Sequence, residues 1–344
     1  MVDLTVRGAG IFGLSIAWAC VQRGAHVRVI DPYGAGAGSS GGVVGALAPH
    51  VTENWNPKKA FQLESLLMAE AFWETVQKTS GVNPGYIRSG RIQPIADEAA
   101  LELARARAQT SQTLWGDHAQ WRVLRADEAQ DWTVHSPSGW IIHDSLSALL
   151  HPRRAIDALV AALSTKGVSV VVDAPDEGRV VWATGIAGLQ ALNANHPRSV
   201  GGGVKGQAAV FDYDARGSAQ LFVDGLHIIP HLDGTVAVGS TSERDYAIPD
   251  TTDELLDQVI ARARDALPLL RDAKVVNRWA GVRPRARSRA PMLGAWPDRA
   301  GHYIANGGFK IGFGMAPKIA EVMADLVLDG CDSIPSGFEV AASL

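Results

Sequence analysis

The chain has 344 residues, of which 47% are hydrophobic and 20% charged, with a formal net charge of −4 at pH 7. Because this length exceeds what one hydrophobic core usually supports, we expect two domains. The slightly acidic balance argues against a protein built around nucleic acid or an anionic membrane, and two cysteines argue against a disulfide framework or a cysteine-rich metal site. We recognise neither a signal peptide nor an apolar run long enough to span a bilayer, and we expect a cytoplasmic protein.

The first 31 residues predict a strand, a helix and a second strand. Leu4 and Val6 alternate with polar neighbours as strand residues do, a helical run ends at Gly24, and residues 26–31 return to a strand pattern. Between the first strand and the helix lies Gly-Ala-Gly-Ile-Phe-Gly, residues 8–13, which has the G-x-G-x-x-G spacing of a dinucleotide-binding turn.

Each part of this unit has a physical role in binding an adenine dinucleotide. Gly8 allows a tight turn, Gly10 leaves room for a pyrophosphate against the backbone, and Gly13 lets the helix pack closely on the strand. The helix N-terminus offers free N–H groups to the phosphates. Asp31, at the end of the second strand, is placed to accept hydrogen bonds from a ribose diol, and its charge disfavours NADP.

A second loop rich in glycine and serine follows, over residues 32–50. It is either a flexible surface loop or a second cofactor contact, with Ser39 and Ser40 reaching phosphate or ribitol hydroxyls. Its position directly after the acid of a dinucleotide-binding unit favours the cofactor contact.

The remaining elements follow in chain order. We expect helices over residues 60–80, 98–115, 151–166, 253–267 and 318–328, a helix start at 126–129, and strands over 86–95, 140–142, 167–172, 179–185 and 303–305. Alternation and glycine-containing turns over residues 201–243 predict a mostly antiparallel sheet. The strand that ends in Ala183-Thr184-Gly185 predicts a return to the first domain after an insertion, because such a small-residue turn lets the backbone approach a cofactor.

Six separated stretches carry a family resemblance, namely residues 8–31, 39–49, 180–185, 229–243, 281–294 and 307–317. In this order they resemble the FAD-dependent amine and amino-acid oxidase family, which includes glycine oxidase, D-amino-acid dehydrogenase and monomeric sarcosine oxidase. They also resemble the oxidase half of a bifunctional enzyme that modifies the tRNA wobble uridine.

The resemblance implies an α/β fold, with a Rossmann-type FAD-binding domain interleaved with a mixed, mainly antiparallel β-sheet substrate domain. We assign residues 1–85, 143–200 and 290–344 to the FAD-binding domain, and residues 86–142 and 201–289 to the substrate domain. The loop over residues 307–314 would run beside the flavin, where the N-terminus of the last helix stabilises negative charge; Pro317, taken as the start of that helix, supports this.

The cofactor is expected to be FAD without a covalent link, because residues 39–42 contain no histidine and residues 283–294 contain no cysteine. No metal site is expected. The predicted cofactor-binding residues are Gly8, Gly10, Ile11, Phe12, Gly13, Asp31, Pro32, Ser39, Ser40, Gly45, Ala46, Leu47, Ala183, Thr184, Gly185, Gly308, Phe309, Lys310, Ile311 and Gly312.

Three residues are candidates for the chemistry. Arg283 occupies the family position that grips a substrate carboxylate, and a planar guanidinium suits that role. Lys310 is either the second half of a carboxylate clamp or a solvated lysine, and His50 is either near the flavin or structural. Tyr246 is a weaker candidate for lining the substrate pocket.

Several neighbouring residues bear on these candidates. Arg285, Arg287 and Arg289 fit a basic surface loop better than the site. Ala237 stands where sarcosine oxidase carries an oxygen-activating lysine, so the family position leaves open an acceptor other than oxygen.

These features favour an enzyme that oxidises the C–N bond of a small amino acid or N-substituted glycine, of the D-amino-acid, glycine or sarcosine type, to an imine by hydride transfer to flavin N5. The electron acceptor would be oxygen or a quinone, and no nucleic-acid partner is expected. The alternatives are an oxidase acting on a modified tRNA wobble uridine, suggested by the five arginines of residues 277–294, and a flavin-binding subunit of a larger oxidase. An NAD-dependent dehydrogenase leaves residues 183–185 and 306–317 without a role.

Overall fold

The computed structural model describes residues 1–129, 132 and 134–344. Leu4 and Val6 are fully buried in the strand β1, which lies near the middle of a six-stranded sheet. The sheet has the order β15-β16-β9-β1-β2-β8, and all neighbours pair in parallel except β15 and β16. Its strands are β1 (Leu4–Arg7), β2 (Val27–Ile30), β8 (Val170–Val171), β9 (Arg179–Trp182), β15 (Met292–Ala295) and β16 (His302–Asn306).

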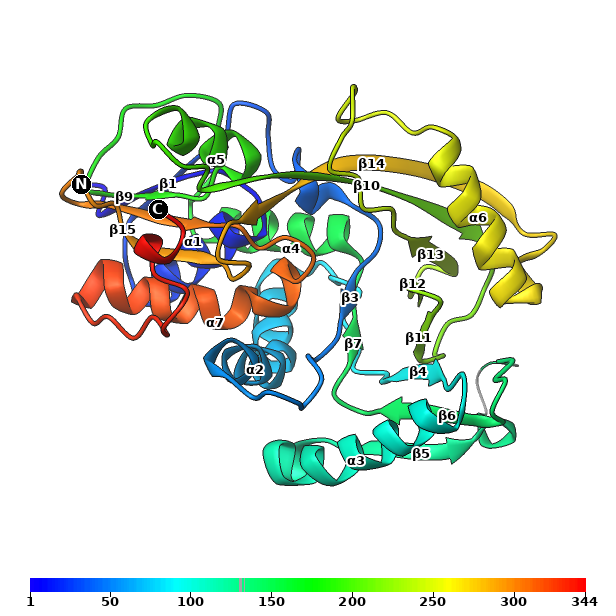
Figure 1. The fold of residues 1–344 in the computed structure, drawn as a ribbon. Helices are drawn as coiled ribbons and strands as arrows, with labels where there is room; N and C mark the ends of the chain where they lie inside the picture. The colour runs from blue at the N-terminus through cyan, green and yellow to red at the C-terminus, as the bar shows by residue number, and fades with distance from the viewer. Residues whose placement is uncertain (130–131, 133) are drawn as a thin grey trace.

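Helices pack around this sheet and on one another. Figure 1 shows α1 beside β1, with α2, α4 and α7 grouped on one side of the sheet and α5 on the other. Helices α1 and α2 each contact both α4 and α7, so one apolar core runs from the sheet through two helical layers. The helices of this part are α1 (Ile11–Gln22), α2 (Pro57–Ser80), α4 (Pro152–Thr165), α5 (Gly185–Ala194) and α7 (Gly312–Ala324).

An eight-stranded sheet forms the second part of the molecule, in the order β14-β10-β13-β12-β11-β4-β6-β5. All neighbours pair antiparallel except β4 and β11, which are parallel. The strands are β4 (Arg91–Pro94), β5 (Trp121–Arg125), β6 (Trp140–Asp144), β10 (Gly201–Asp212), β11 (Gln220–Val223), β12 (Leu226–Pro230), β13 (Thr235–Gly239) and β14 (Lys274–Ala286). This confirms the predicted mixed, mainly antiparallel sheet.

Two helices cover the second sheet, α6 (Glu254–Ala266) against β10, β12 and β13, and α3 (Glu98–Trp115) against β5. The long strands β10 and β14 extend from this sheet to the first part of the molecule (Figure 1). A two-stranded sheet of β3 (Ala46–Leu47) and β7 (Ala148–Leu149) lies between the two larger ones. No helix in the described residues is both long and apolar enough to cross a membrane.

The two larger sheets draw their strands alternately along the chain, as an interleaved fold requires. β6 runs across our predicted boundary between residues 142 and 143, and the domain limits themselves stay a prediction.

Several predicted elements differ from the structure in extent. Residues 126–128 form a single 3₁₀ turn, because Ala129 returns to an extended backbone, and residues 130–131 lie outside the described part. The strand expected over residues 167–172 is reduced to β8, since this strand lies at the sheet edge and pairs only with β2.

The last helix also begins earlier than predicted. We placed its start at Pro317, but α7 begins at Gly312 and contains Pro317. Gly312 and Gly314 let the first turn lie close to α1 and α2, with Ile11 and Leu66 as neighbours, and this packing offsets the backbone hydrogen bond that the proline lacks.

Candidate active site

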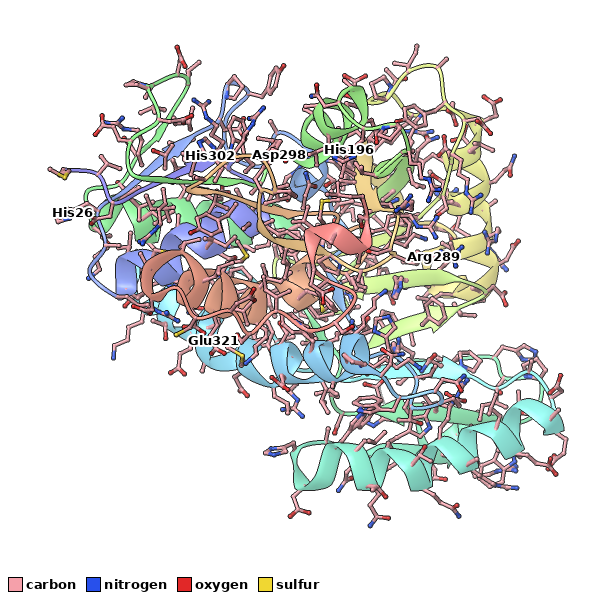
Figure 2. The ribbon with its side chains drawn as sticks, turned by 60° about the vertical axis from the view of Figure 1, so that its left-hand side comes forward. His26, His196, Arg289, Asp298, His302 and Glu321 are labelled. Atoms are coloured by element: carbon pink, nitrogen blue, oxygen red, sulfur yellow. The ribbon has the colours of Figure 1, made fainter. Side chains whose placement is uncertain are left out.

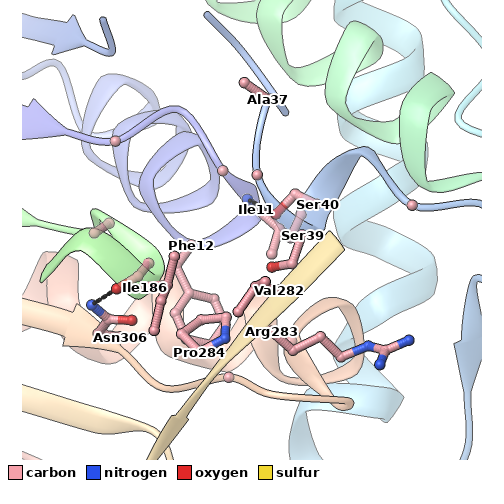
Figure 3. A pocket seen from close by; sticks show the side chains of 18 of the residues that line it. Ile11, Phe12, Ala37, Ser39, Ser40, Ile186, Val282, Arg283, Pro284 and Asn306 are labelled. Atoms are coloured by element: carbon pink, nitrogen blue, oxygen red, sulfur yellow. Dashed lines mark hydrogen bonds between the residues drawn. The ribbon is translucent and has the colours of Figure 1, made fainter. Parts of the chain in front are cut away.

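A cavity of about 450 Å³ lies where the carboxyl end of the six-stranded sheet meets the eight-stranded sheet. Its lining includes residues that follow β1, β9 and β16, the loop after β2, and residues of β10 and β14. Figure 3 shows this convergence, with Ser39 and Ser40 beside Ile11 on one side and Val282 and Pro284 of β14 on the other. Such a cavity at the carboxyl edge of a parallel sheet is the usual position for a bound dinucleotide.

The glycines of the first turn are required by close contacts. Gly8 has φ +104°, and a Cβ atom there would lie 2.3 Å from the carbonyl oxygen of Ala183. A Cβ on Gly13 would lie 1.9 Å from the carbonyl oxygen of Gly8. The turn therefore brings the backbones of β1, β9 and α1 together. The close packing of α1 on β1 is the part that the spacing predicts.

Two side chains tie the glycine-rich loops to the first turn. Asp31 accepts hydrogen bonds from the backbone N–H groups of Ala9, at 2.7 Å, and Tyr33, at 2.9 Å, with separate carboxylate oxygens. Ser40 accepts one from the N–H of Ile11 at 3.0 Å. Each carboxylate oxygen of Asp31 still has a lone pair, so the aspartate can also accept from a ribose hydroxyl.

The far wall comes from the end of β16 and the loop that follows it. Asn306 donates from Nδ2 to the carbonyl oxygen of Gly185 at 2.9 Å, the dashed line in Figure 3, and its Oδ1 accepts from the N–H of Gly307. The N–H of Phe309 donates to the carbonyl oxygen of Pro284, which joins this loop to β14. Because α7 begins at Gly312, its positive end faces the cavity.

Arg283 reaches the cavity from β14 and keeps most of its donors free. Its Nη2 donates to the hydroxyl of Ser240 at 2.8 Å, and its Nη1 lies 3.4 Å from the carbonyl oxygen of Thr241. Burial lowers the pKa of Arg283 to about 10, although the nearby Glu243 opposes this effect, so the guanidinium is charged at neutral pH. Within the described residues it forms no ion pair, and a planar fork without a partner is suited to a ligand carboxylate.

Glu243 does not satisfy Arg283, because other groups hold it. The almost fully buried ammonium of Lys205 lies 3.6 Å from Oε2 of Glu243 and 3.2 Å from Oδ2 of Asp253. Gln207 donates to both carboxylates, and Thr241 hydrogen bonds to Glu243. We did not predict this network. Lys205 and Gln207 stand in the stretch that we placed directly before the first strand of the sheet, whereas in the structure both belong to β10.

Lys310 lines the same cavity from the loop before α7, and its side chain is exposed. Burial of part of the side chain, followed by the charges of Arg283 and Arg285, lowers its pKa below the ordinary lysine value. The guanidinium of Arg285 lies 5.2 Å from the ring centroid of Phe309, and the ammonium of Lys310 lies 5.8 Å from it. The cavity therefore carries an excess of positive charge on this side.

The other three arginines differ from one another. We expected Arg285, Arg287 and Arg289 in a surface loop. Arg287 and Arg289 are indeed exposed beyond the end of β14, and Figure 2 labels Arg289. Arg285, in contrast, belongs to β14 and is partly buried. The position of Arg285 follows from this strand. We did not predict the strand because arginines and Pro284 are not typical of a strand pattern.

His50 lies outside the cavity lining. Its ring nitrogen Nδ1 and its backbone N–H both contact Oε1 of Gln62, and the amide of Gln62 donates to the carbonyl oxygen of Ala48. Burial lowers the pKa of His50, so the ring is neutral at neutral pH. A structural role accounts for these contacts.

Most of the predicted cofactor residues line the cavity, and a few support it from outside. The predicted residues that are not part of the lining are Gly13, Leu47, Ile311 and His50. Tyr246 and Ala237 also lie outside it. The lining residues that we did not single out include Val43, Val44, Trp182, Ile186, Trp279 and Asn306. Trp182 and Asn306 could have been found, since each stands at the carboxyl end of a parallel strand.

Comparison with known proteins decides the family. Residues 3–326 match the family model described as FAD dependent oxidoreductase, DAO. The chain belongs to this family. Its cofactor is FAD, and it is an oxidoreductase.

Individual proteins are similar over nearly the full length of this oxidoreductase. Glycine oxidase of Geobacillus kaustophilus is 23% identical over 379 residues, which cover 94% of the chain and 92% of that protein. The crystal structure of glycine oxidase from Geobacillus kaustophilus matches with a TM-score of 0.86 at 20% identity, covering 98% of each chain. The structure of iminodiacetate oxidase from Chelativorans sp. BNC1 matches with a TM-score of 0.84 at 21% identity, covering 97% of each chain.

The residues present fit FAD. The close contacts at Gly8 and Gly13 leave a smooth backbone wall, the first turn of α1 faces the cavity, and Asp31 stands at the end of β2. No histidine or cysteine among the lining residues offers a covalent attachment.

Proposed function

We propose that this oxidoreductase oxidises the C–N bond of a small amino acid or N-substituted glycine, of the D-amino-acid, glycine or sarcosine type, to an imine. One observation carries the proposal: the glycines of the dinucleotide turn and Arg283 line a single cavity. A carboxylate held by Arg283 would therefore lie in the same space as the redox cofactor. The names of the similar proteins, glycine oxidase and iminodiacetate oxidase, support an amine that bears a carboxylate.

The residues of this chain bind and orient the substrate. Arg283 has five N–H donors, of which Ser240 and Thr241 occupy two, so it can present a bidentate pair to the carboxylate. Lys310 adds a second positive charge from the opposite loop. FAD, when bound, supplies the hydride acceptor. Fixing the carboxylate restricts where the α-carbon lies, and such orientation lowers the barrier without a strong general base.

The cofactor-binding roles follow the same lining. We assign phosphate binding to the first turn of α1 with Gly10, Ile11 and Ser40, and ribose binding to Asp31. The start of α7 at Gly312 would stabilise negative charge on the reduced flavin.

The choice of a small amine over a tRNA nucleotide rests on the arginines. Arg283 belongs to the cavity, Arg285 stacks against Phe309, and Arg287 hydrogen bonds to the C-terminal carbonyl of Leu344. They therefore do not form one open basic surface of the kind that holds a nucleic-acid backbone. We further propose oxygen or a quinone as the acceptor and a reducing cytoplasm as the compartment, in keeping with the free thiols of Cys20 and Cys331.

The proposal is tested by mixing the holoenzyme anaerobically with glycine, sarcosine, D-alanine, L-proline or iminodiacetate and following the visible flavin absorbance. At least one of them should bleach the flavin, and Arg283→Ala should need a far higher concentration for the same rate while keeping its FAD. Arg289→Ala, which removes an exposed guanidinium, is the control. Bleaching by none of the amines, with normal reduction by dithionite, would reject the proposal, as would an unchanged concentration dependence in Arg283→Ala.

A further inference from the structure

Three metal-ligating side chains gather next to the cavity wall but take no part in the site described above. They are His151, His231 and Asp233, and their candidate ligand atoms all lie within 4.8 Å of one another. His151 directly precedes Pro152, which lines the cavity, and the other two residues belong to the hairpin between β12 and β13. We propose that they bind a divalent transition-metal ion, with Zn²⁺ as the ion best suited to them.

The surroundings of His231 fix which of its nitrogens is free. The hydroxyl of Thr235 donates to Oδ1 of Asp233 at 2.7 Å, so it can only accept from Nδ1 of His231, which lies 3.1 Å away. Nδ1 therefore carries the proton, and Nε2 keeps its lone pair. His231 is 1% exposed, and within the part of the chain that the structure describes no hydrogen bond of normal geometry reaches Nε2, although the backbone of Val43 lies near the ring. A buried imidazole nitrogen without a partner is costly unless a ligand occupies it.

The other two side chains point their free atoms to the same place. Oδ1 of Asp233 is occupied by Thr235, whereas Oδ2 lies 3.9 Å from Nε2 of His151. The rings of His151 and His231 have centroids 4.4 Å apart. Nδ1 of His151 is buried and has no partner among the described residues. The three ligand atoms would be Nε2 of His231, Oδ2 of Asp233 and one ring nitrogen of His151. An ion would draw them together, because zinc binds nitrogen and oxygen ligands at about 2.0–2.2 Å.

The donor set determines the class of ion. Two imidazoles and one carboxylate suit zinc and its first-row neighbours, while Mg²⁺ and Ca²⁺ prefer oxygen ligands. Thr235 would not bind the ion itself, but its hydroxyl orients both His231 and Asp233, as residues behind the ligands of metal sites commonly do. A water would complete the coordination.

At this position the ion would cross-link two separate parts of the chain. His151 lies between β7 and the start of α4, on the side of the six-stranded sheet, and the hairpin belongs to the eight-stranded sheet. The ion would thus join two parts of the chain that are 80 residues apart in sequence, one of which reaches the cavity wall at Pro152.

The test uses the FAD-loaded protein after dialysis against a chelator, titrated with Zn²⁺ alone. Calorimetry should show one ion per chain with a Kd of about 1 μM or lower, and the thermal midpoint should rise on addition of Zn²⁺. His151→Gln and Asp233→Asn should each lose most of this binding, and Thr235→Val, which removes only the orienting hydroxyl, should weaken it by about 10–100-fold. The flavin spectrum shows that each variant is folded.

A matched control is available at the surface. His26 and Asp3 also form a histidine–carboxylate pair, 3.1 Å apart, but both side chains are exposed, and Figure 2 labels His26 at the edge of the molecule. His26→Gln should bind Zn²⁺ as the wild type does. Absence of stoichiometric binding at about 100 μM Zn²⁺ would overturn the proposal, and so would wild-type affinity in both His151→Gln and Asp233→Asn.

Discussion

A Cβ atom on Gly206 would lie 1.7 Å from Nη1 of Arg283, so the guanidinium occupies space that only a glycine on β10 leaves free. Gly206→Ala should therefore displace Arg283 without touching the dinucleotide turn. We expect KM for the amino-acid substrate to rise by at least about tenfold, since a charge-assisted hydrogen bond is worth about 1.5–3 kcal/mol, with FAD content unchanged.

Gly202 provides the control for that variant. It lies on the same strand, and a Cβ there would meet nothing within 4 Å. Steady-state kinetics of Gly202→Ala should match the wild type, and equal KM values for both variants would show that the position of Arg283 does not govern substrate binding.

The pKa of Lys310 predicts a pH dependence for carboxylate binding. Burial and the charges of Arg283 and Arg285 lower this pKa, so Lys310 loses its proton, and the site loses a positive charge, at a lower pH than an ordinary lysine would. Binding of acetate, followed through the flavin spectrum, should be strongest below that pKa and weaken as the pH rises through it. Acetate is chosen because it has no amine that titrates in the same range.

Two variants separate this effect from other titrations. Arg285→Gln removes one of the neighbouring charges and should move the loss of acetate binding to higher pH. Lys310→Met should abolish this pH step altogether. If the step persists in Lys310→Met, another group is responsible.

Gly13 should control FAD retention. A Cβ there would lie 1.9 Å from the carbonyl oxygen of Gly8, so Gly13→Ala must separate α1 from the dinucleotide turn. An overpacking cost of about 1–3 kcal/mol should appear as FAD binding weaker by about tenfold or more. Fluorescence of released flavin on dilution measures it, with Gly202→Ala as the comparison; equal retention would mean that α1 tolerates the shift.

The ion pair between Arg91 and Asp144 should matter for stability rather than activity. Nε of Arg91 donates to Oδ2 of Asp144 at 3.0 Å, and the side chains are 8% and 0% exposed. Asp144→Ala leaves a buried cation without a partner and should lower the free energy of unfolding by about 3–5 kcal/mol. Asp214→Ala, which breaks an exposed pair with Arg216, should cause no measurable change in urea unfolding. Equal effects would mean that burial adds nothing to the pair.

The sequence predicted the parts of the fold that depend on local patterns. The helix over residues 98–115 matches α3 at both ends, because Asp97 caps its start and Gly116 ends it. The glycine spacing indicated the turn between β1 and α1, since the close contact of Gly13 with Gly8 is set within 13 residues, whereas the contact of Gly8 with Ala183 depends on the distant strand β9. The Pro317 and β14 assignments were wrong because packing against neighbouring elements outweighed local preference.

Contacts between residues far apart in the chain could not be predicted from the sequence. Lys205 meets Glu243 only through the pairing of β10 with the segment after β13, and no spacing in the chain shows it. The same holds for His151 and His231, which two different sheets bring together. Such groups become visible only when the register of the strands is known.

The parallel pair of β4 and β11 bears on how this chain reaches its native state. The partners stand at residues 91–94 and 220–223, so the three-stranded ribbon of β4, β6 and β5 leaves the ribosome long before the strand that completes its open edge. Unpaired strand edges on nascent chains attract other chains, and pairing across such a separation is slow. Production of this protein should accordingly benefit from slower synthesis, at lower temperature, that gives the late hairpins time to close the sheet.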